Sequence, residues 1–451
     1  MLPSAEASVL PQAATSTRRA PTRRCSSRSM GRPRILPAGA RQIRRPRSCP
    51  WRCFSTMWAR LRLRDGSKVP LLRISNPGAR SRDRPRRSAM RSLPEHCSLR
   101  VGRFPAMTAT DAGTGLWDIA LNPTATPTDD TTREAVLADP GFGRKFTDNM
   151  VRAKWTAEQG WHDAELVGYA PLLLDPATNF IHYGQAIFEG LKAYRHADGS
   201  IKTFRPFRNA QRFANSARRL AMAELPEELF VGSIEALVRA DRDWVPQDAE
   251  KSLYLRPFMF STEIGLGVKP ANAYEYLLIA SPAGAYFPRA IKPVSVWLSD
   301  DYVRAAPGGT GEAKCAGNYA ASLIAQAEAA QHGCDQVVWL DAAERRWIEE
   351  MGGMNLYFVY GSGDGARLMT PRLTGSLLPG ITRDSLLTVA ADLGIRADEA
   401  EISVEDWKNG CASGEITEVF ACGTAAVITP VGEVKSRTSG AWTVGDGGTG
   451  P

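Results

Sequence analysis

The sequence predicts an α+β protein with two folded domains. The chain has 451 residues, 43% of them hydrophobic and 23% charged, which is enough for two domains of ordinary size. Short runs of β-forming residues alternate with longer helical patterns over most of its length. A short segment bounded by prolines, residues 288–293, divides these runs into two groups. No apolar run reaches the length of a membrane span, so we expect a soluble protein without a membrane partner.

Residues 1–106 differ in composition from the rest of the chain. They hold 25 of the 56 Lys and Arg residues but only 4 of the 48 Asp and Glu residues, and they are rich in Pro and Ser. Because they lack sustained apolar periodicity, we do not expect them to fold alone. After Met107 the balance reverses to 31 basic and 44 acidic residues, so the charge of this larger part gives no reason to expect nucleic-acid binding.

Three interpretations of residues 1–106 stay open. An Arg- and Ser-rich segment that is poor in acids is typical of a transit peptide, which would indicate an organelle. A basic tail could also bind nucleic acid, although aromatic residues are sparse and no binding motif accompanies them. We favour the third interpretation, a non-native segment with translation starting at Met107, because the composition changes abruptly there.

The cysteines favour a reducing compartment. There are eight, and the closely spaced pair Cys49 and Cys53 has no second pair nearby that would complete a zinc site. No pattern indicates a disulfide framework. We therefore expect no metal and a cytoplasmic location.

The first domain is expected at residues 142–287, after a polar arm at residues 107–141. Asn209 is predicted to cap a helix whose inner face carries small and apolar side chains. That inner face consists of Phe213, Ser216, Ala217, Leu220 and Ala221. A second helix is predicted over residues 227–242. The predicted strands cover residues 146–155, 190–194, 201–204, 252–260 and 275–280, with a hairpin turn at residues 196–200.

The second domain is expected at residues 294–451, after a link at residues 288–293. The predicted helices cover residues 320–331, 383–393 and 404–408. The predicted strands cover residues 294–298, 335–340, 346–351, 355–360, 366–369, 418–421 and 426–429, with a short strand near Glu401.

A glycine-rich loop at residues 307–319 places Lys314 just ahead of a helical run. Its glycines allow sharp turns and leave room for a bulky ligand, although a lone lysine in such a loop is more often simply solvated. Two later features change this interpretation. Glu350 stands at a predicted strand end beside paired glycines, and residues 377–383 form a turn that opens a helix. A lysine, an acid and a helix N-terminus are the parts that hold pyridoxal phosphate.

Four further motifs along the chain strengthen this interpretation. They are Tyr183-Gly-Gln-Ala-Ile-Phe-Glu-Gly190, Ser252-Leu-Tyr-Leu-Arg-Pro257, Gly284-Ala-Tyr-Phe287 and Cys422-Gly-Thr-Ala-Ala426. From Phe142 to Thr429 the chain resembles the branched-chain amino acid aminotransferases. These belong to the fold type IV pyridoxal phosphate enzymes, which also include D-amino acid aminotransferase and aminodeoxychorismate lyase. The resemblance implies a smaller N-terminal α/β domain, a larger β-rich C-terminal domain, the cofactor between them, and a homodimer.

The resemblance also implies how pyridoxal 5′-phosphate is held. Lys314 matches the lysine that forms the Schiff base and then acts as the general base. Glu350 matches the acid that keeps the pyridine nitrogen protonated, and adjacent Glu349 is expected to point the opposite way along its strand. Tyr319 matches the tyrosine that binds the phenolic oxygen. The phosphate is expected to meet Arg212, Ile381, Thr382 and Thr424.

The substrate residues implied by the resemblance serve two kinds of side chain. An aromatic pocket is expected to bury leucine, isoleucine or valine, and it would consist of Phe142, Tyr183, Phe188, Tyr254 and Tyr286. Arg256 is expected to meet the distal carboxylate of glutamate. The α-carboxylate is expected to rest on the turn that contains Thr424, Ala425 and Ala426.

The sequence therefore predicts a branched-chain amino acid transaminase of amino-acid biosynthesis. It would move the amino group of leucine, isoleucine or valine to 2-oxoglutarate. Two alternatives stay open: another enzyme of the same fold type, D-amino acid transaminase or aminodeoxychorismate lyase, and a relative that no longer transaminates. The second is kept because the final amphipathic helix of the family is expected to be missing after Gly445.

Overall fold

The computed structural model describes residues 100–101, 117–284 and 292–448. All of these described residues belong to one compact unit. The basic segment, the link predicted at residues 288–293 and Tyr286 lie wholly or mostly outside the described residues. Among the described residues, no helix is long and apolar enough to cross a membrane.

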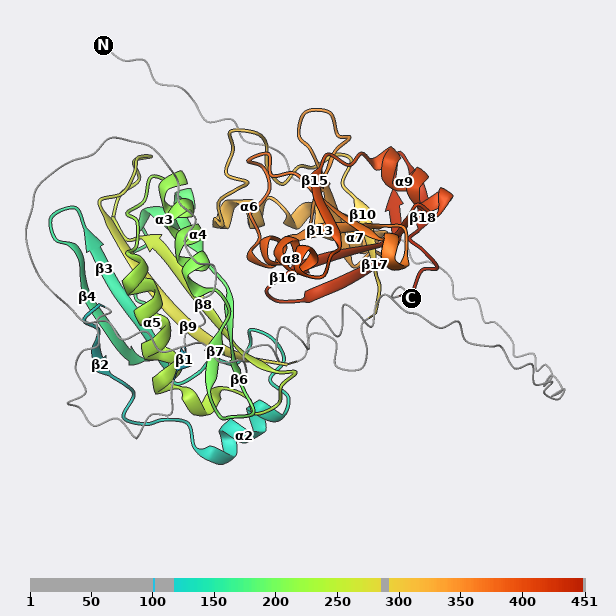
Figure 1. Cartoon of the computed structure of the whole chain (residues 1–451). Coiled ribbons are helices and arrows are strands. Elements are labelled where there is room, and N and C mark those ends of the chain that lie inside the picture. Colours follow the sequence, from blue (N-terminus) through green and yellow to red (C-terminus); the bar gives the residue numbers. More distant parts are fainter. Residues whose placement is uncertain (1–99, 102–116, 285–291, 449–451) are drawn as a thin grey trace, which may run out of the picture. The chain divides into compact units, whose positions relative to one another are not determined.

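The strands before residue 284 form one nine-stranded sheet, in the order β1-β7-β6-β8-β9-β3-β4-β2, with β5 paired to β8 (Figure 1). Neighbouring strands are antiparallel except β2 and β4. Their bounds are β1 Arg100–Val101, β2 Ala120–Asn122, β3 Asn149–Thr156, β4 Gly160–Gly168, β5 Ala186–Phe188, β6 Leu191–Arg195, β7 Ile201–Thr203, β8 Ser252–Ser261 and β9 Ala273–Ala283.

Two helices, α4 (Pro206–Arg219) and α5 (Glu227–Ala240), complete the core of this sheet. The Phe213 ring of α4 lies 5.5 Å from Phe230 of α5 and 5.9 Å from Tyr276 of β9, measured between centroids. All three side chains are fully buried. Of two shorter helices, α2 (Asp130–Ala138) packs against this core through the half-buried Val136 and Leu137, whereas α3 (Asn179–Tyr183) lies outside it.

The prediction that Asn209 caps α4 is wrong. The helix begins earlier, at Pro206, whose ring presets φ for the first turn, and Arg205 precedes it in the left-handed region. Asn209 lies in the second turn, and its buried side chain donates to Glu189 Oε2 over 2.8 Å. The predicted inner face is confirmed for Phe213, Ser216 and Ala217, whereas Leu220 is half-buried after the helix end and Ala221 is exposed.

The polar arm contains a helix that was not predicted. Helix α2 lies within residues 107–141, and the Asp129 side chain caps it by accepting from the Thr132 amide. The apolar residues of α2 form one run, residues 135–138, instead of recurring at helical spacing, so no apolar periodicity indicated this helix.

The strands after residue 292 form a second nine-stranded sheet, in the order β12-β11-β10-β17-β16-β13-β14-β15, with β18 paired to β17. Since β12 also pairs with β13, six of these strands close into a ring, which removes their free edges. Their bounds are β10 Val294–Leu298, β11 Gln336–Leu340, β12 Ile348–Met351, β13 Met354–Tyr360, β14 Arg367–Pro371, β15 Arg396–Ala400, β16 Ile416–Gly423, β17 Val427–Ser436 and β18 Gly440–Thr443.

Four helices accompany this sheet: α6 (Ala316–Ala320), α7 (Leu323–Gln331), α8 (Ile381–Asp392) and α9 (Val404–Ser413). Residues 320–331 were predicted as one helix, but the helical structure starts before them and is interrupted between α6 and α7. The α+β fold class is confirmed by the two sheets with their helices.

Candidate active site

Lys314 lies in the loop between β10 and α6, and its backbone is tied to the first sheet. Its amide donates to Ser216 Oγ on α4 over 2.9 Å, and its carbonyl accepts from the amide of Phe188 over 3.0 Å. Its Nζ donates to the hydroxyl of Tyr319 over 2.7 Å and lies 4.6 Å from the centroid of the Phe188 ring. Lys314 as a whole is thus held by residues from three separate segments, and two of these, Tyr319 and Phe188, contact its amine.

The surroundings of Lys314 make its amine a better base and nucleophile at neutral pH. Burial lowers the pKa of Lys314 to about 8, and the nearby Arg212 guanidinium acts in the same direction. Glu189 opposes this change because a negative charge favours the ammonium form. A substantial fraction of Lys314 is therefore uncharged near pH 8.

Tyr319 keeps its phenolic proton. Burial raises the pKa of this tyrosine above its usual value, and Glu350 adds to the effect. Its ring lies 4.8 Å from the Phe188 ring, centroid to centroid, so the two aromatic side chains flank Lys314 Nζ together. The hydroxyl is available both to accept from the lysine and to donate to an anionic oxygen.

Glu350 is a buried carboxylate on β12, 1% exposed. Its Oε1 accepts from the amide of Leu378 and lies 3.3 Å from Nη2 of Arg304. Burial raises the pKa of Glu350, while the Arg304 charge and the Leu378 hydrogen bond counteract that rise. Among the described residues, no hydrogen bond occupies Oε2, so this oxygen could accept from a ring nitrogen.

Glu349 does not behave as expected of a neighbour that points away. It is 5% exposed, and its Oε1 accepts from the hydroxyl of Ser376, in the same loop that carries Leu378. Both carboxylates therefore reach one loop, although alternation along a regular strand would separate them. Burial raises the pKa of Glu349 as well.

Arg212 on α4 is buried and forms a bidentate ion pair with Glu189. Its Nε lies 2.7 Å from Oε1 and its Nη2 2.8 Å from Oε2 of a carboxylate with no exposed surface. The remaining Nη1 donates to the carbonyl of Pro379 over 3.1 Å. The guanidinium therefore reaches the turn before α8, although most of its donors already have partners.

The start of α8 leaves backbone donors available. Gly380 occupies the N-cap position, so no side chain accepts from the first amides of the helix, among them those of Ile381 and Thr382. A Cβ at Gly380 would lie 1.9 Å from Oδ1 of Asn355, so only glycine fits this turn. Free amides at a helix N-terminus together with a nearby arginine form an anion site.

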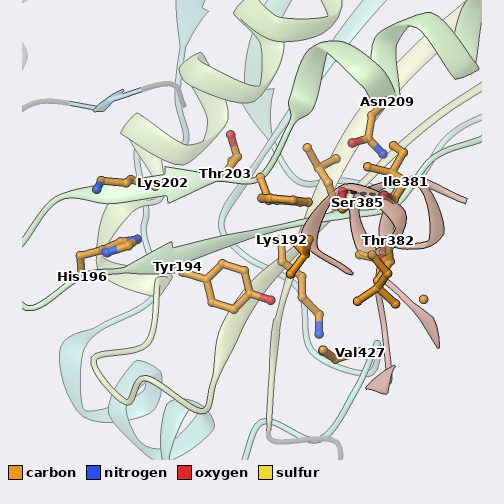
Figure 2. A pocket seen from close by; sticks show the side chains of 16 residues that line it. Lys192, Tyr194, His196, Lys202, Thr203, Asn209, Ile381, Thr382, Ser385 and Val427 are labelled. Atoms are coloured by element: carbon orange, nitrogen blue, oxygen red, sulfur yellow. Dashed lines mark hydrogen bonds between the residues drawn. The ribbon is translucent and has the colours of Figure 1, made fainter. Parts of the chain in front are cut away.

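A largely apolar cavity of about 190 Å³ lies beside this turn (Figure 2). Ile381, Thr382 and Thr424 line it together with Lys192 of β6 and Asn209 of α4. Figure 2 shows Lys192, Thr382 and Val427 at one end, with Tyr194 and His196 farther along. Three of the residues predicted to hold a phosphate thus share one cavity.

Four of the eight predicted substrate residues form a connected group next to Lys314. The ring of Phe142 contacts that of Tyr254 edge-on at 5.0 Å between centroids, and the Tyr254 hydroxyl accepts from Arg256 Nη2 over 3.2 Å. The Arg256 guanidinium lies 4.8 Å from the centroid of the Phe188 ring, which in turn contacts Lys314 Nζ.

Three other predicted substrate residues lie differently. Tyr183 is 43% exposed, and its hydroxyl donates to the carbonyl of Leu266 at the surface. Ala425 and Ala426 form the turn after β16, where the Ala425 carbonyl accepts from Lys192 Nζ over 2.9 Å. Tyr286 is outside the described residues.

Three residues that contact the predicted site, Glu189, Arg304 and Lys192, were not singled out from the sequence. The burial of Glu349 was not expected either. Glu189 could have been found from the sequence, because an acid that directly follows an apolar run inside the motif at residues 183–190 indicates a buried charge that needs a partner. The described residues contain no cluster of His, Cys, Asp and Glu that could hold a metal ion.

The chain is similar in sequence to known proteins. The family model for amino-transferase class IV matches residues 186–434. A probable branched-chain-amino-acid aminotransferase of Streptomyces coelicolor is 62% identical over 333 residues, which are 74% of this chain and 91% of the relative.

Solved structures give the same result for the fold. The crystal structure of the Escherichia coli branched-chain amino acid aminotransferase is 30% identical with a TM-score of 0.54, over 66% of this chain and 90% of that one. The T.th. branched-chain amino acid aminotransferase complexed with N-(5′-phosphopyridoxyl)-L-glutamate is 29% identical with a TM-score of 0.53, over 66% and 89% of the two chains.

Proposed function

Since the chain belongs to the amino-transferase class IV family, we propose that it is a pyridoxal phosphate-dependent branched-chain amino acid transaminase. It transfers the amino group of leucine, isoleucine or valine to 2-oxoglutarate, reversibly, in two half-reactions. The observation that carries the proposal is the lysine amine of lowered pKa, held at 2.7 Å from Tyr319 beside the aromatic and arginine side chains of the substrate group.

The donor set fits pyridoxal 5′-phosphate. Lys314 would hold the aldehyde carbon, Oε2 of Glu350 the ring nitrogen and the Tyr319 hydroxyl the phenolic oxygen. The phosphate would be held by Arg212, Thr424 and the uncapped amides of Ile381 and Thr382. When bound, the cofactor withdraws electrons from the Cα of the amino acid, which makes its proton removable.

Lys314 supplies the proton transfer. With its Nζ free, Lys314 would act as the general base that takes the proton from the substrate Cα, and its protonated Nζ would then act as the general acid. The hydrogen bond to Tyr319 and the contact with Phe188 keep Nζ in one place between these steps.

The group around Arg256 accounts for two unlike substrates. Phe142, Phe188 and Tyr254 offer apolar surface to a branched side chain, while Arg256 carries the charge that glutamate needs. One methylene in such a pocket is worth only about 1–3 kcal/mol, so we expect the three branched amino acids to be poorly separated.

We further propose that the enzyme is a homodimer in the cytoplasm. An apolar surface patch supports the dimer, since Ile264 pairs with Thr178 and brings two exposed segments together. The patch consists of Leu173, Ile181, Tyr183, Ile264, Leu266 and Val268. The four cysteines in the described part of the chain are free thiols, which supports a reducing compartment.

The test is a visible absorption spectrum of the purified protein loaded with pyridoxal phosphate. We expect the band of the lysine-bound cofactor to be lost on adding leucine and to return with 2-oxoglutarate. Lys314→Ala should lack the band, whereas Lys154→Ala, which removes an exposed lysine paired with Asp163, should keep it. A protein whose band does not respond to any of the three branched amino acids would contradict the proposal.

A further inference from the structure

Arg304 is a buried cation whose role the proposed function leaves unexplained. It lies in the loop after β10 and is only 8% exposed. A buried guanidinium is costly unless several groups accept from it, so its partners indicate what it does. They lie in the loop of Lys314, in the loop of Leu378 and on β12.

The hydrogen bonds of Arg304 join the two loops of the site. Its Nη2 donates to the carbonyl of Gly311 over 3.1 Å and to that of Ser376 over 2.7 Å. The loops also touch directly, because a Cβ at Gly311 would lie 2.1 Å from the Ser376 carbonyl oxygen. Ser376 is two residues before Leu378, whose amide binds Glu350.

The charge of Arg304 faces two buried carboxylates. Its Nη2 lies 3.3 Å from Glu350 Oε1, and its charge counteracts the effect of burial on both Glu349 and Glu350. Other charges also act on Glu350: Glu349 disfavours its ionised form, whereas Lys314 and the more distant Arg212 favour it. In the part of the chain that the structure describes, Arg304 is the cation in ion-pair contact with Glu350.

Both contacts of Glu350, with Arg304 and with Leu378, are made through Oε1. We propose that Arg304 is a positioning residue that keeps Glu350 ionised and turns Oε2 toward the pyridine nitrogen of the cofactor. The inference rests on the proposed function, and it assigns to Arg304 an effect specific to that nitrogen. A carboxylate that must pair with a pyridinium gains from being oriented by a second partner, as metal ligands do.

Binding of two cofactors to the apoprotein separates this role from a structural one. The probes are pyridoxal phosphate and its 1-deaza analogue, in which carbon replaces the ring nitrogen. We expect Arg304→Met to weaken pyridoxal phosphate binding by about tenfold or more, and 1-deaza binding by less than about twofold. Arg304→Lys should recover part of the loss, because it keeps the charge but not the paired geometry.

Two further variants complete the experiment. Arg195→Met removes an arginine that also donates to two carbonyls, those of Val245 and Arg242, and it should change neither affinity. In a Glu350→Gln background, Arg304→Met should cause no further loss that is specific to pyridoxal phosphate. If Arg304→Met does not fold, as seen by circular dichroism, Arg304→Lys carries the test with about a threefold loss toward pyridoxal phosphate alone.

Equal weakening of both cofactors, or no weakening of either, would overturn the role of Arg304 while leaving the proposed function intact. A wild-type protein that binds neither cofactor would overturn the proposed function, and the inference with it. Retention of the nitrogen-specific loss in Glu350→Gln would show that Arg304 acts through another group and would also overturn the inference.

Discussion

At the scale of single residues, the site combines buried groups of opposite charge with an amine whose proton is easily lost. Burial and the Arg212 charge lower the pKa of Lys314, and Arg212 itself forms an ion pair with Glu189. The charge of each side chain affects the pKa of its neighbours. Two of these effects give separate predictions, one for Lys314 and one for Glu189.

The lowered pKa of Lys314 predicts the pH dependence of cofactor capture. Only the uncharged amine attacks an aldehyde, so the rate at which apoprotein captures pyridoxal phosphate should rise with pH and reach half its maximum near the Lys314 pKa of about 8. Stopped-flow absorbance between about pH 6 and pH 10 measures this. A midpoint near the ordinary lysine value of 10.5 would contradict the assignment of a perturbed amine.

The buried pair of Glu189 and Arg212 predicts a large stability effect. Glu189→Gln leaves a buried guanidinium without its counter-charge and should lower the free energy of unfolding by about 3 kcal/mol in urea titrations at neutral pH. Because Arg212 holds the pKa of Glu189 below its usual value, this contribution is present above the unfolded-state pKa and is lost as the pH falls through the lower folded-state pKa.

The matched control is Glu224→Gln. Glu224 forms an equally bidentate pair with Arg218, but both side chains are exposed, so the free energy of unfolding should hardly change. Similar losses in the two variants would show that burial does not determine the effect.

Some residues of the predicted site belong to local sequence motifs, whereas others are recognised only by contacts between distant parts of the chain. Lys314 and Glu350 stand in recognisable glycine-containing motifs, so they could be found from the sequence. Arg304 precedes the glycine-rich residues 307–319 in the loop between β10 and α6, and its partners Ser376 and Glu350 become its neighbours only in the folded chain. No local pattern records such a contact, and the roles carried over from the family remain predictions.

At the scale of elements, helix starts show why sequence patterns mislead near a functional site. An asparagine before an amphipathic run favours an N-cap, but Asn209 is used inside α4 to bind Glu189. At α8 the opposite occurs: the N-cap is a glycine with no capping side chain, which leaves amides for a ligand. By contrast, Ser403 and Asp406 form a complete capping box on α9.

Gly380→Ala should therefore impair the start of α8. The new Cβ would overlap Oδ1 of Asn355, whose side chain is fixed by a hydrogen bond from Nδ2 to the Leu378 carbonyl. We expect a loss of about 1–3 kcal/mol in the free energy of unfolding and weaker binding of pyridoxal phosphate. Thermal denaturation and a binding titration of the apoprotein measure the two effects.

Gly365→Ala is the control for this substitution. Gly365 is exposed, and nothing lies within 4 Å of the position its Cβ would occupy. Cofactor affinity should be unchanged. Normal stability and affinity in Gly380→Ala would mean that the turn before α8 adapts, and that its glycine is not required for the proposed phosphate site.

At the scale of the whole molecule, the class of the fold could be predicted but the closure of the second sheet could not. Strand runs such as residues 294–298 were confirmed because their β-forming residues end in a buried apolar run, residues 296–298. Closure depends on β12 pairing with both β11 and β13, and this is set by register between strands. Strand β18 was missed because its four residues carry little apolar pattern.

The apolar surface patch predicts the state of assembly. Leu266 and Val268 are 66% and 82% exposed, and the Tyr183 hydroxyl binds the Leu266 carbonyl, so the predicted substrate residue Tyr183 belongs to the same surface. Replacing Leu266 and Val268 together by glutamate should convert a dimer into a monomer, because like charges would meet across a twofold interface. Sedimentation equilibrium measures the mass.

The control for the patch is Leu323→Glu, which places a charge on an apolar side chain of α7 that is 62% exposed. That variant should stay dimeric, since Leu323 is not part of the patch. If the double variant is monomeric and its transaminase activity falls while the band of the lysine-bound cofactor persists, the interface completes the substrate group rather than the cofactor site. A wild-type protein that sediments as a monomer would instead require the exposed apolar side chains to have another partner.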